Sequence, residues 1–148
     1  NLGFSGNALL DMEIAELMAS VDDPGLYVLD YVPNASADAI DQVGEHFFRR
    51  IRDAHPEVPV VFIEDVIFPH TIFDNKILEE VTKKNLAQKR LFKKLKQSGE
   101  KRIYYISAEG MIGDDGEATV DAIHFTDLGA MRYVDHVLPL IKRALRCH

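Results

Sequence analysis

Apolar residues recur along the chain at two spacings, which predict helices alternating with strands. Spacings of three and four place Leu10, Ile14, Leu17, Met18 and Val21 on one face of a helix over roughly residues 8–21. A nearly continuous apolar run, Leu26–Val32, follows between turn residues. Such a run is typical of a strand that is buried on both faces.

The same alternation continues through the middle of the chain. A second helix is expected from its N-cap, Ser36, to the His55-Pro56 stop, with a buried strand over Val58–Glu64 after it. A long charged helix over residues 76–97 then leads to a third strand, Arg102–Ser107.

The end of the chain predicts a loop and a last helix. A glycine-rich acidic loop over Glu109–Ala118 precedes Asp121–His124, and Thr126 is a suitable N-cap for the helix that follows. Its buried stripe is expected at Met131, Val134, Leu138, Ile141 and Leu145.

Strands of about six residues alternating with helices, and without hairpin signals, predict an α/β domain with a parallel sheet and helices on both faces. Three strands are few for such a sheet, so we expect at least one further strand upstream of Asn1. In open parallel sheets, functional residues gather in loops at the carboxyl ends of the strands. The loops expected there hold Asn34, Asp65–His70 and Asp121–His124.

Composition narrows the function. The 148 residues have the size of one domain, 1–148, and a formal charge of −7, which repels nucleic acids and anionic membranes and favours small neutral partners. Nine of the 17 basic residues lie between Lys83 and Arg102, where we favour a solvated helix face over contact with a polyanion. No apolar run is long enough to span a membrane.

Other classes of site have little support in the sequence. The single cysteine, Cys147, predicts neither an intrachain disulfide nor a metal site, and no cofactor motif is present. Residues 1–7 lack the features of a signal peptide. A signal further upstream would indicate a periplasmic or secreted protein, and the oligomeric state is not predicted.

Five residues carry candidate chemistry, and each feature also has a plainer interpretation. His124 with Asp121 three residues before it predicts an oriented general base or, alternatively, a surface pair. Asn34 can donate to an oxyanion or complete a Pro-Asn turn, and Gly6 can present a backbone amide to an anion or serve a plain turn. His70 lines a substrate cleft or is a surface histidine.

Taken together and in this order, these elements resemble the SGNH/GDSL-type hydrolases of the lipase/acylhydrolase superfamily. Asn1–Gly6 matches the family's Asn-x-Gly-x-Ser-Gly block, Asn34 its asparagine block, and Asp121-x-x-His124 its last block. The resemblance implies a flavodoxin-like three-layer α/β/α fold and serine-dependent hydrolysis of a carboxylic ester, without a cofactor. It also implies a small-molecule or carbohydrate ester as substrate, such as an O-acetylated sugar.

The resemblance implies roles for the residues as well: His124 as the base, Asp121 as its orienting carboxylate, and Gly6 and Asn34 as oxyanion donors. The family's nucleophile lies in a Gly-Asp-Ser block before the glycine block, so the serine is expected outside this chain. Ser5 reads as a turn residue, and Ser36 and Ser107 lack a supporting pattern.

Two alternatives stay open at this point. One is a non-catalytic SGNH-like domain that binds a ligand in the same cleft. The other is a metal-dependent hydrolase that uses Asp121, His124 and His70.

Overall fold

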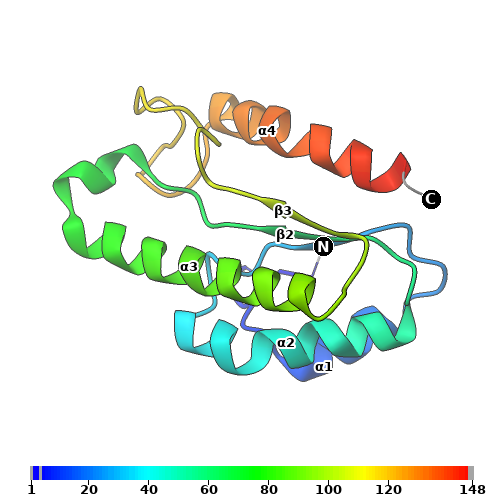
Figure 1. The fold of residues 1–148 in the computed structure, drawn as a ribbon. Coiled ribbons are helices and arrows are strands. Elements are labelled where there is room, and N and C mark those ends of the chain that lie inside the picture. The colour runs from blue at the N-terminus through cyan, green and yellow to red at the C-terminus, as the bar shows by residue number, and fades with distance from the viewer. Residues whose placement is uncertain (1, 4, 147–148) are drawn as a thin grey trace.

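The computed structural model describes residues 2–3 and 5–146, and its helices and strands alternate in the predicted order (Figure 1). Asn1 of the glycine block and Cys147 lie outside the described residues. The elements are α1 (Met12–Ala19), β1 (Tyr27–Leu29), α2 (Ala37–Ala54), β2 (Val60–Ile63), the 3₁₀ helix η1 (Pro69–Phe73), α3 (Asn75–Gln97), β3 (Ile103–Ile106) and α4 (Asp127–Arg146).

The three strands form one parallel sheet in the order β1-β2-β3. Val60 of β2 is the register partner of both Tyr27 of β1 and Ile103 of β3. Parallel neighbours need a crossover, and α2 and α3 provide the two crossovers here. All carboxyl ends therefore meet at one edge of the sheet. The architecture is an α/β fold of the predicted flavodoxin-like kind.

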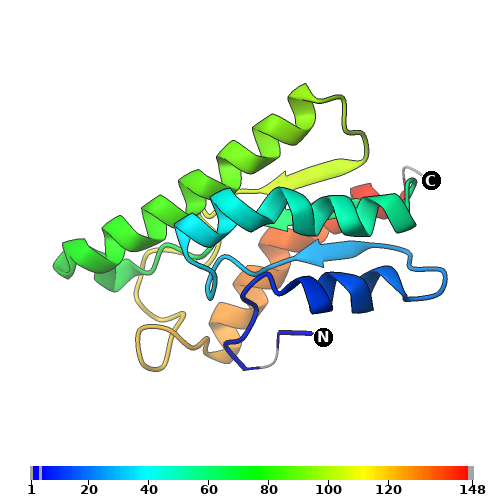
Figure 2. The same cartoon turned by 90° about the horizontal axis from the view of Figure 1, so that it is seen from below.

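Helices cover the sheet on both faces. Figure 1 shows α4 on one side and α1, α2 and α3 on the other, and Figure 2 shows these three helices beside one another from below. On the three-helix side, Phe48 and Ile40 of α2 pack with Phe62 of β2. On the opposite side, Val61 and Ile106 of the sheet pack with Val137 and other residues of α4. The sheet is thus buried between two cores.

Two side-chain caps confirm predicted helix starts. The Ser36 hydroxyl accepts a hydrogen bond from the Ala39 amide at 3.1 Å, and the Thr126 hydroxyl accepts one from the Gly129 amide at 3.1 Å. Each cap satisfies a backbone amide that has no partner inside its helix. The first helix begins later than predicted, at Met12, because Leu10 has a left-handed φ of 67° and Asp11 is extended.

The predicted stripes of the first and last helices are partly wrong. Leu17 and Val21 are exposed near α1, and Met131, Val134 and Leu145 of α4 are exposed as well. The predicted Ile141 does pack against the core, but it does so beside Tyr133 and Leu140. The buried residues of α4 are Gly129, Val137 and Ala144. Helix α4 has two apolar faces, and periodicity alone does not tell which one packs on this sheet.

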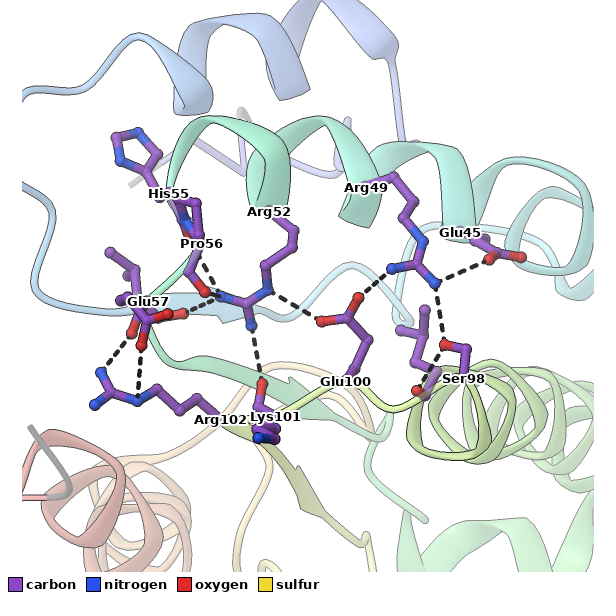
Figure 3. A network of polar contacts seen from close by, with 12 residues as sticks. Glu45, Arg49, Arg52, His55, Pro56, Glu57, Ser98, Glu100, Lys101 and Arg102 are labelled. Carbon is purple, nitrogen blue, oxygen red and sulfur yellow. Dashed lines mark hydrogen bonds and ion pairs between the residues drawn. The ribbon is translucent and has the colours of Figure 1, made fainter.

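A buried arginine fixes the amino-terminal edge of the sheet, away from the loops of interest (Figure 3). The Arg52 guanidinium donates to four backbone carbonyls, those of His55, Pro56, Val58 and Lys101. Its Nε lies 3.3 Å from a carboxylate oxygen of Glu100, which also pairs with Arg49. This network ties the end of α2 to the segments that enter β2 and β3.

Within the described residues, every helix is too short or too polar to cross a bilayer.

Candidate active site at the carboxyl edge of the sheet

Asp121 and His124 form a bonded pair in the loop between β3 and α4. The His124 Nδ1 lies 2.7 Å from Asp121 Oδ2, and Asp121 Oδ1 accepts the backbone amides of His124 at 2.8 Å and Ile123 at 3.0 Å. Hydrogen bonds lower the pKa of Asp121 to about 2: first that from the His124 amide, then that with the His124 ring, then that from the Ile123 amide. Asp121 is therefore a carboxylate at neutral pH. The Asp121 side chain is 51% exposed and the His124 side chain 78% exposed, so a substrate can reach His124.

The loop that carries this pair is closed at its base. Thr119 and Phe125 form an antiparallel bridge, and the Val120 amide donates to the His124 carbonyl at 2.9 Å. The Thr126 amide donates to the Ala118 carbonyl at 3.0 Å. A Cβ at Gly129 would lie only 2.0 Å from that same carbonyl oxygen. The absence of a side chain there lets α4 press directly against the base of the loop.

Gly6 and Asn34 form the second pair, at the carboxyl end of β1. Gly6 has a φ of +88°, a backbone conformation that favours glycine, and a Cβ there would lie 3.9 Å from Asn34 Nδ2. Asn34 lies at the end of a turn that its own backbone amide closes by donating to the Tyr31 carbonyl at 2.9 Å. The Gly6 backbone and the Asn34 amide group thus lie side by side, as two oxyanion donors must.

A groove of about 690 Å³ runs along β1 and contains this second pair. Its walls come from the glycine-block turn, from α1 through Ile14 and Met18, and from β1 itself. In the described residues β1 has a paired neighbour on one side only, β2, so its other edge faces the groove. Val28, in the middle of the strand, is 40% exposed.

The structure brings each pair together but does not place all four residues in one cavity. Gly6 and Asn34 line the groove along β1, whereas Asp121 and His124, which are also described, do not. His70 lies in η1 and lines a different cavity, with its ring centroid 5.7 Å from that of Phe68. The roles of these residues stay predictions.

Two acidic residues at the carboxyl edge have raised pKa values: Asp30, which was not among the expected positions, and Asp65, which begins the expected loop Asp65–His70. The Tyr133 hydroxyl of α4 donates to Asp30 at 2.9 Å, and burial raises the pKa of Asp30. Burial also raises the pKa of Asp65, to about 6. The Asp65 backbone is held by the Asn85 side chain through two hydrogen bonds of 2.8 Å. Asp30 lies inside a predicted apolar strand, and a carboxyl group within such a run is the sequence feature that could have marked it as a site residue.

Ser5, Ser36 and Ser107 are the serines considered as nucleophiles from the sequence. Ser36 caps α2, the Ser107 carbonyl lies 2.9 Å from His136 Nε2, and Ser5 lies in an exposed turn with a φ of 52°. Within the described part of the chain, none of the three hydroxyls is bonded to His124. Across residues 2–3 and 5–146, no three histidine, cysteine, aspartate or glutamate side chains gather as a metal site. The three-residue set of the metal-dependent alternative is therefore not assembled.

Comparisons with known proteins agree on one family. The model of the GDSL-like Lipase/Acylhydrolase family matches residues 1–142. A solved protein of Bacteroides ovatus ATCC 8483, described as a GDSL-like lipase, is 31% identical with a TM-score of 0.90. That match covers 95% of this chain and 42% of the other, so this chain spans less than half of its length.

A more distant solved structure shares the fold. Salicylyl-acyltransferase SsfX3, from a tetracycline biosynthetic pathway, has a TM-score of 0.67 at 16% identity. The match covers 88% of this chain and 42% of that protein. No curated protein sequence matches the chain.

Proposed function

The chain belongs to the GDSL-like lipase/acylhydrolase family, and from this premise we propose that it carries the base and oxyanion donors of a serine-dependent carboxylic ester hydrolase. The observation that carries the proposal is the 2.7 Å contact between His124 Nδ1 and Asp121 Oδ2. An ionised Asp121 favours the tautomer with the proton on Nδ1, which leaves the lone pair on Nε2. His124 is thereby prepared to accept a proton.

In the proposed reaction, His124 Nε2 takes the proton of a serine hydroxyl while the serine oxygen attacks the ester carbonyl. The imidazolium, stabilised by Asp121, then protonates the leaving alcohol as the carbon–oxygen bond breaks. Water repeats the sequence on the acyl-enzyme and releases the acid. A metal ion is not required for any of these steps.

Gly6 and Asn34 are proposed to stabilise the negative charge that develops on the carbonyl oxygen. Their adjacency at the end of β1 supports this role, because two donors must converge on one oxygen atom. Both residues are exposed to the groove, so a substrate can reach them. Removing one such donor typically costs about a hundred- to a thousandfold in rate.

The serine is proposed to lie on a segment outside residues 1–148 that adds a strand to the free edge of β1. An unpaired strand edge with an apolar groove beside it favours such an addition. The groove also contains the proposed oxyanion donors, and the added strand would therefore end near them. The greater length of the solved relatives supports the existence of such a segment.

Small-molecule esters and O-acetylated carbohydrates are the proposed substrates, and a non-catalytic ligand-binding role is the alternative. Hydrolysis of p-nitrophenyl acetate by the full-length protein separates these two. Replacing His124 by alanine should reduce kcat by about a thousandfold or more. Replacing His46, a histidine of α2 on the other face of the sheet, is the matched control and should leave kcat unchanged. Wild-type protein that is folded but inactive on all such esters would favour the alternative.

A further inference from the structure

A second cavity lies at the carboxyl edge, between the loop after β2 and the loop after β3. Its volume is about 840 Å³, and its walls are η1 with the residues before it on one side and residues 108–116 on the other. Figure 1 shows both loops at the same end of the sheet. Gly6 and Asn34 are not among its lining residues, so the cavity is distinct from the groove along β1.

We propose that this cavity binds the leaving alcohol of the ester, and that it selects an uncharged cyclic alcohol with an apolar face. The inference rests on the proposed function for the identity of the reaction. Its basis is the position of the cavity on the His124 loop, the aromatic residue at its rim and the sign of the charges around it.

The cavity and the general base share one continuous loop. Residues 108–116 form the cavity wall, and the same segment continues to the bridge between Thr119 and Phe125 that closes the His124 loop. His124 must reach the leaving oxygen in order to protonate it. In the proposed arrangement the alcohol lies on the His124 side of the ester and extends toward this wall, while Gly6 and Asn34 bind the carbonyl oxygen from β1.

Phe73 supplies a binding surface. Its side chain is 88% exposed at the cavity, more than any other large apolar residue among those that the structure describes. Ile67, which is 44% exposed, and the half-buried Phe68 line the same cavity. Covering an exposed aromatic ring with a ligand removes apolar surface from water and so favours binding, and a flat apolar face of the ligand covers the ring best.

Charge decides which alcohols fit. The ionisable residues that line the cavity are Glu109, Asp114, Asp115 and His70. Neither lysine nor arginine is among them. Asp115 is paired with Arg132, so the carboxylates of Glu109 and Asp114 are the ones that repel an anionic alcohol and can accept hydrogen bonds from its hydroxyl groups. An aromatic alcohol and a sugar residue both have the required chemistry.

Arg132 of α4 is the positioning residue for the cavity wall. Its guanidinium donates to both Asp115 carboxylate oxygens, at 2.7 and 2.6 Å, and to the Ile112 carbonyl at 3.0 Å. This bond to Arg132 holds the pKa of Asp115 well below its usual range. A Cβ at Gly113 would lie 2.9 Å from the guanidinium, so the wall folds closely around it. Asp115 also accepts the Glu117 amide at 3.1 Å, which continues the connection toward Thr126.

The test compares ester series on the full-length protein. For Phe73→Ala, we expect kcat/KM for benzyl acetate and for an acetylated methyl glucoside to fall about tenfold, relative to methyl acetate. If only one of the two falls, that result identifies the source of the alcohol. In a series of methyl esters with acyl groups of increasing length, the variant and the wild type should show the same dependence of kcat/KM on acyl length. Leu86→Ala, which removes a 50% exposed side chain of α3, is the matched control and should change none of these ratios.

Two further measurements address charge and positioning. The anion 4-(acetoxymethyl)benzoate should react about tenfold more slowly than benzyl acetate, and Glu109→Gln with Asp114→Asn should reduce this difference. Arg132→Met should lower the ratio of benzyl acetate to methyl acetate, whereas a purely structural role would lower both rates equally. Arg90→Met, which breaks an exposed pair with Asp41, is its control.

The outcomes separate this inference from the proposed function. A change in acyl preference, or no change for either cyclic alcohol in Phe73→Ala, would overturn the inference. If the wild-type protein hydrolyses none of the esters, ligand-observed NMR with benzyl alcohol still tests the cavity. Binding that is weakened in Phe73→Ala but retained in Leu86→Ala supports it, and equal binding by all three proteins contradicts it.

Discussion

Replacing Gly129 by alanine tests whether α4 positions His124, the proposed general base. The new Cβ would lie 2.0 Å from the Ala118 carbonyl oxygen, whereas real Cβ atoms essentially never come within 3.0 Å of such an atom. The helix and the base of the His124 loop must therefore separate by about 1 Å or more. The Thr126 amide, which donates to that same carbonyl, must move or lose its bond.

A displacement of about 1 Å at a catalytic group costs about a hundredfold in rate. We therefore expect kcat/KM for p-nitrophenyl acetate to fall about a hundredfold in Gly129→Ala. Overpacking should also lower the free energy of unfolding by about 1–3 kcal/mol, measured by urea denaturation. The gain in helix propensity, about 1 kcal/mol, offsets part of this loss.

Gly44→Ala is the matched control, because Gly44 is also a helical glycine. A Cβ there would lie 2.7 Å from Leu91 Cδ2, in the packing between α2 and α3 on the other face of the sheet. This variant should lose stability without losing kcat/KM beyond twofold. Gly25→Ala, with nothing within 4 Å of the new Cβ, should change neither quantity. Wild-type kcat/KM in Gly129→Ala, or equal losses in Gly129→Ala and Gly44→Ala, would refute the reasoning.

Three further predictions concern stability and one of the proposed oxyanion donors. Asp65 has a folded pKa of about 6 against an ordinary value of 3.8, so its contribution to stability is fully present below about pH 4 and is lost as the pH rises through 6. Asp65→Asn should therefore be more stable than wild type by about 3 kcal/mol at pH 7.5 and equally stable at pH 3.5. Urea titrations at both pH values measure this difference. Arg52→Met should lower the free energy of unfolding by about 3–5 kcal/mol, because it leaves four carbonyls without their donor and Glu100 with Arg49 as its remaining partner. A loss below about 1 kcal/mol, as expected for the exposed Arg90, would contradict this. Asn34→Ala should lower kcat about a hundred- to a thousandfold with KM little changed, and an effect on KM alone would exclude an oxyanion role.

Local signals in the sequence predicted much of the fold. Apolar spacing identified the helices and strands, and the hydroxyls of Ser36 and Thr126 marked two helix starts that the structure confirms. The absence of hairpin signals predicted the parallel sheet. These features depend on neighbours within a few residues, which a sequence displays directly.

Features that depend on distant neighbours were not predictable in the same way. The apolar stripe of α4 through Met131 and Val134 is as regular as the buried face through Val137 and Ala144, and only the packing on the sheet distinguishes them. The bond between Tyr133 and Asp30 joins positions 103 residues apart. No spacing rule connects such positions, since their proximity follows from the folded sheet.

In the candidate site, too, the local features were predictable from the sequence and the long-range ones were not. Asp121 and His124 are three residues apart, and a local loop conformation is enough to bond them. Gly6 and Asn34 were candidates from their turn positions, and the resemblance implied their shared role; their adjacency depends on how the first turn lies on β1. Arg132 and Asp115 escaped the sequence reading because a charged residue on an exposed helix gives no sign of what it holds.

The most direct test of the central claim is labelling of the full-length protein with a fluorophosphonate probe, followed by identification of the modified residue. A serine outside residues 1–148 should be labelled, and His124→Ala should abolish labelling while His46→Ala should not. Labelling of Ser5, Ser36 or Ser107, or labelling of His124→Ala at the wild-type rate, would contradict that claim.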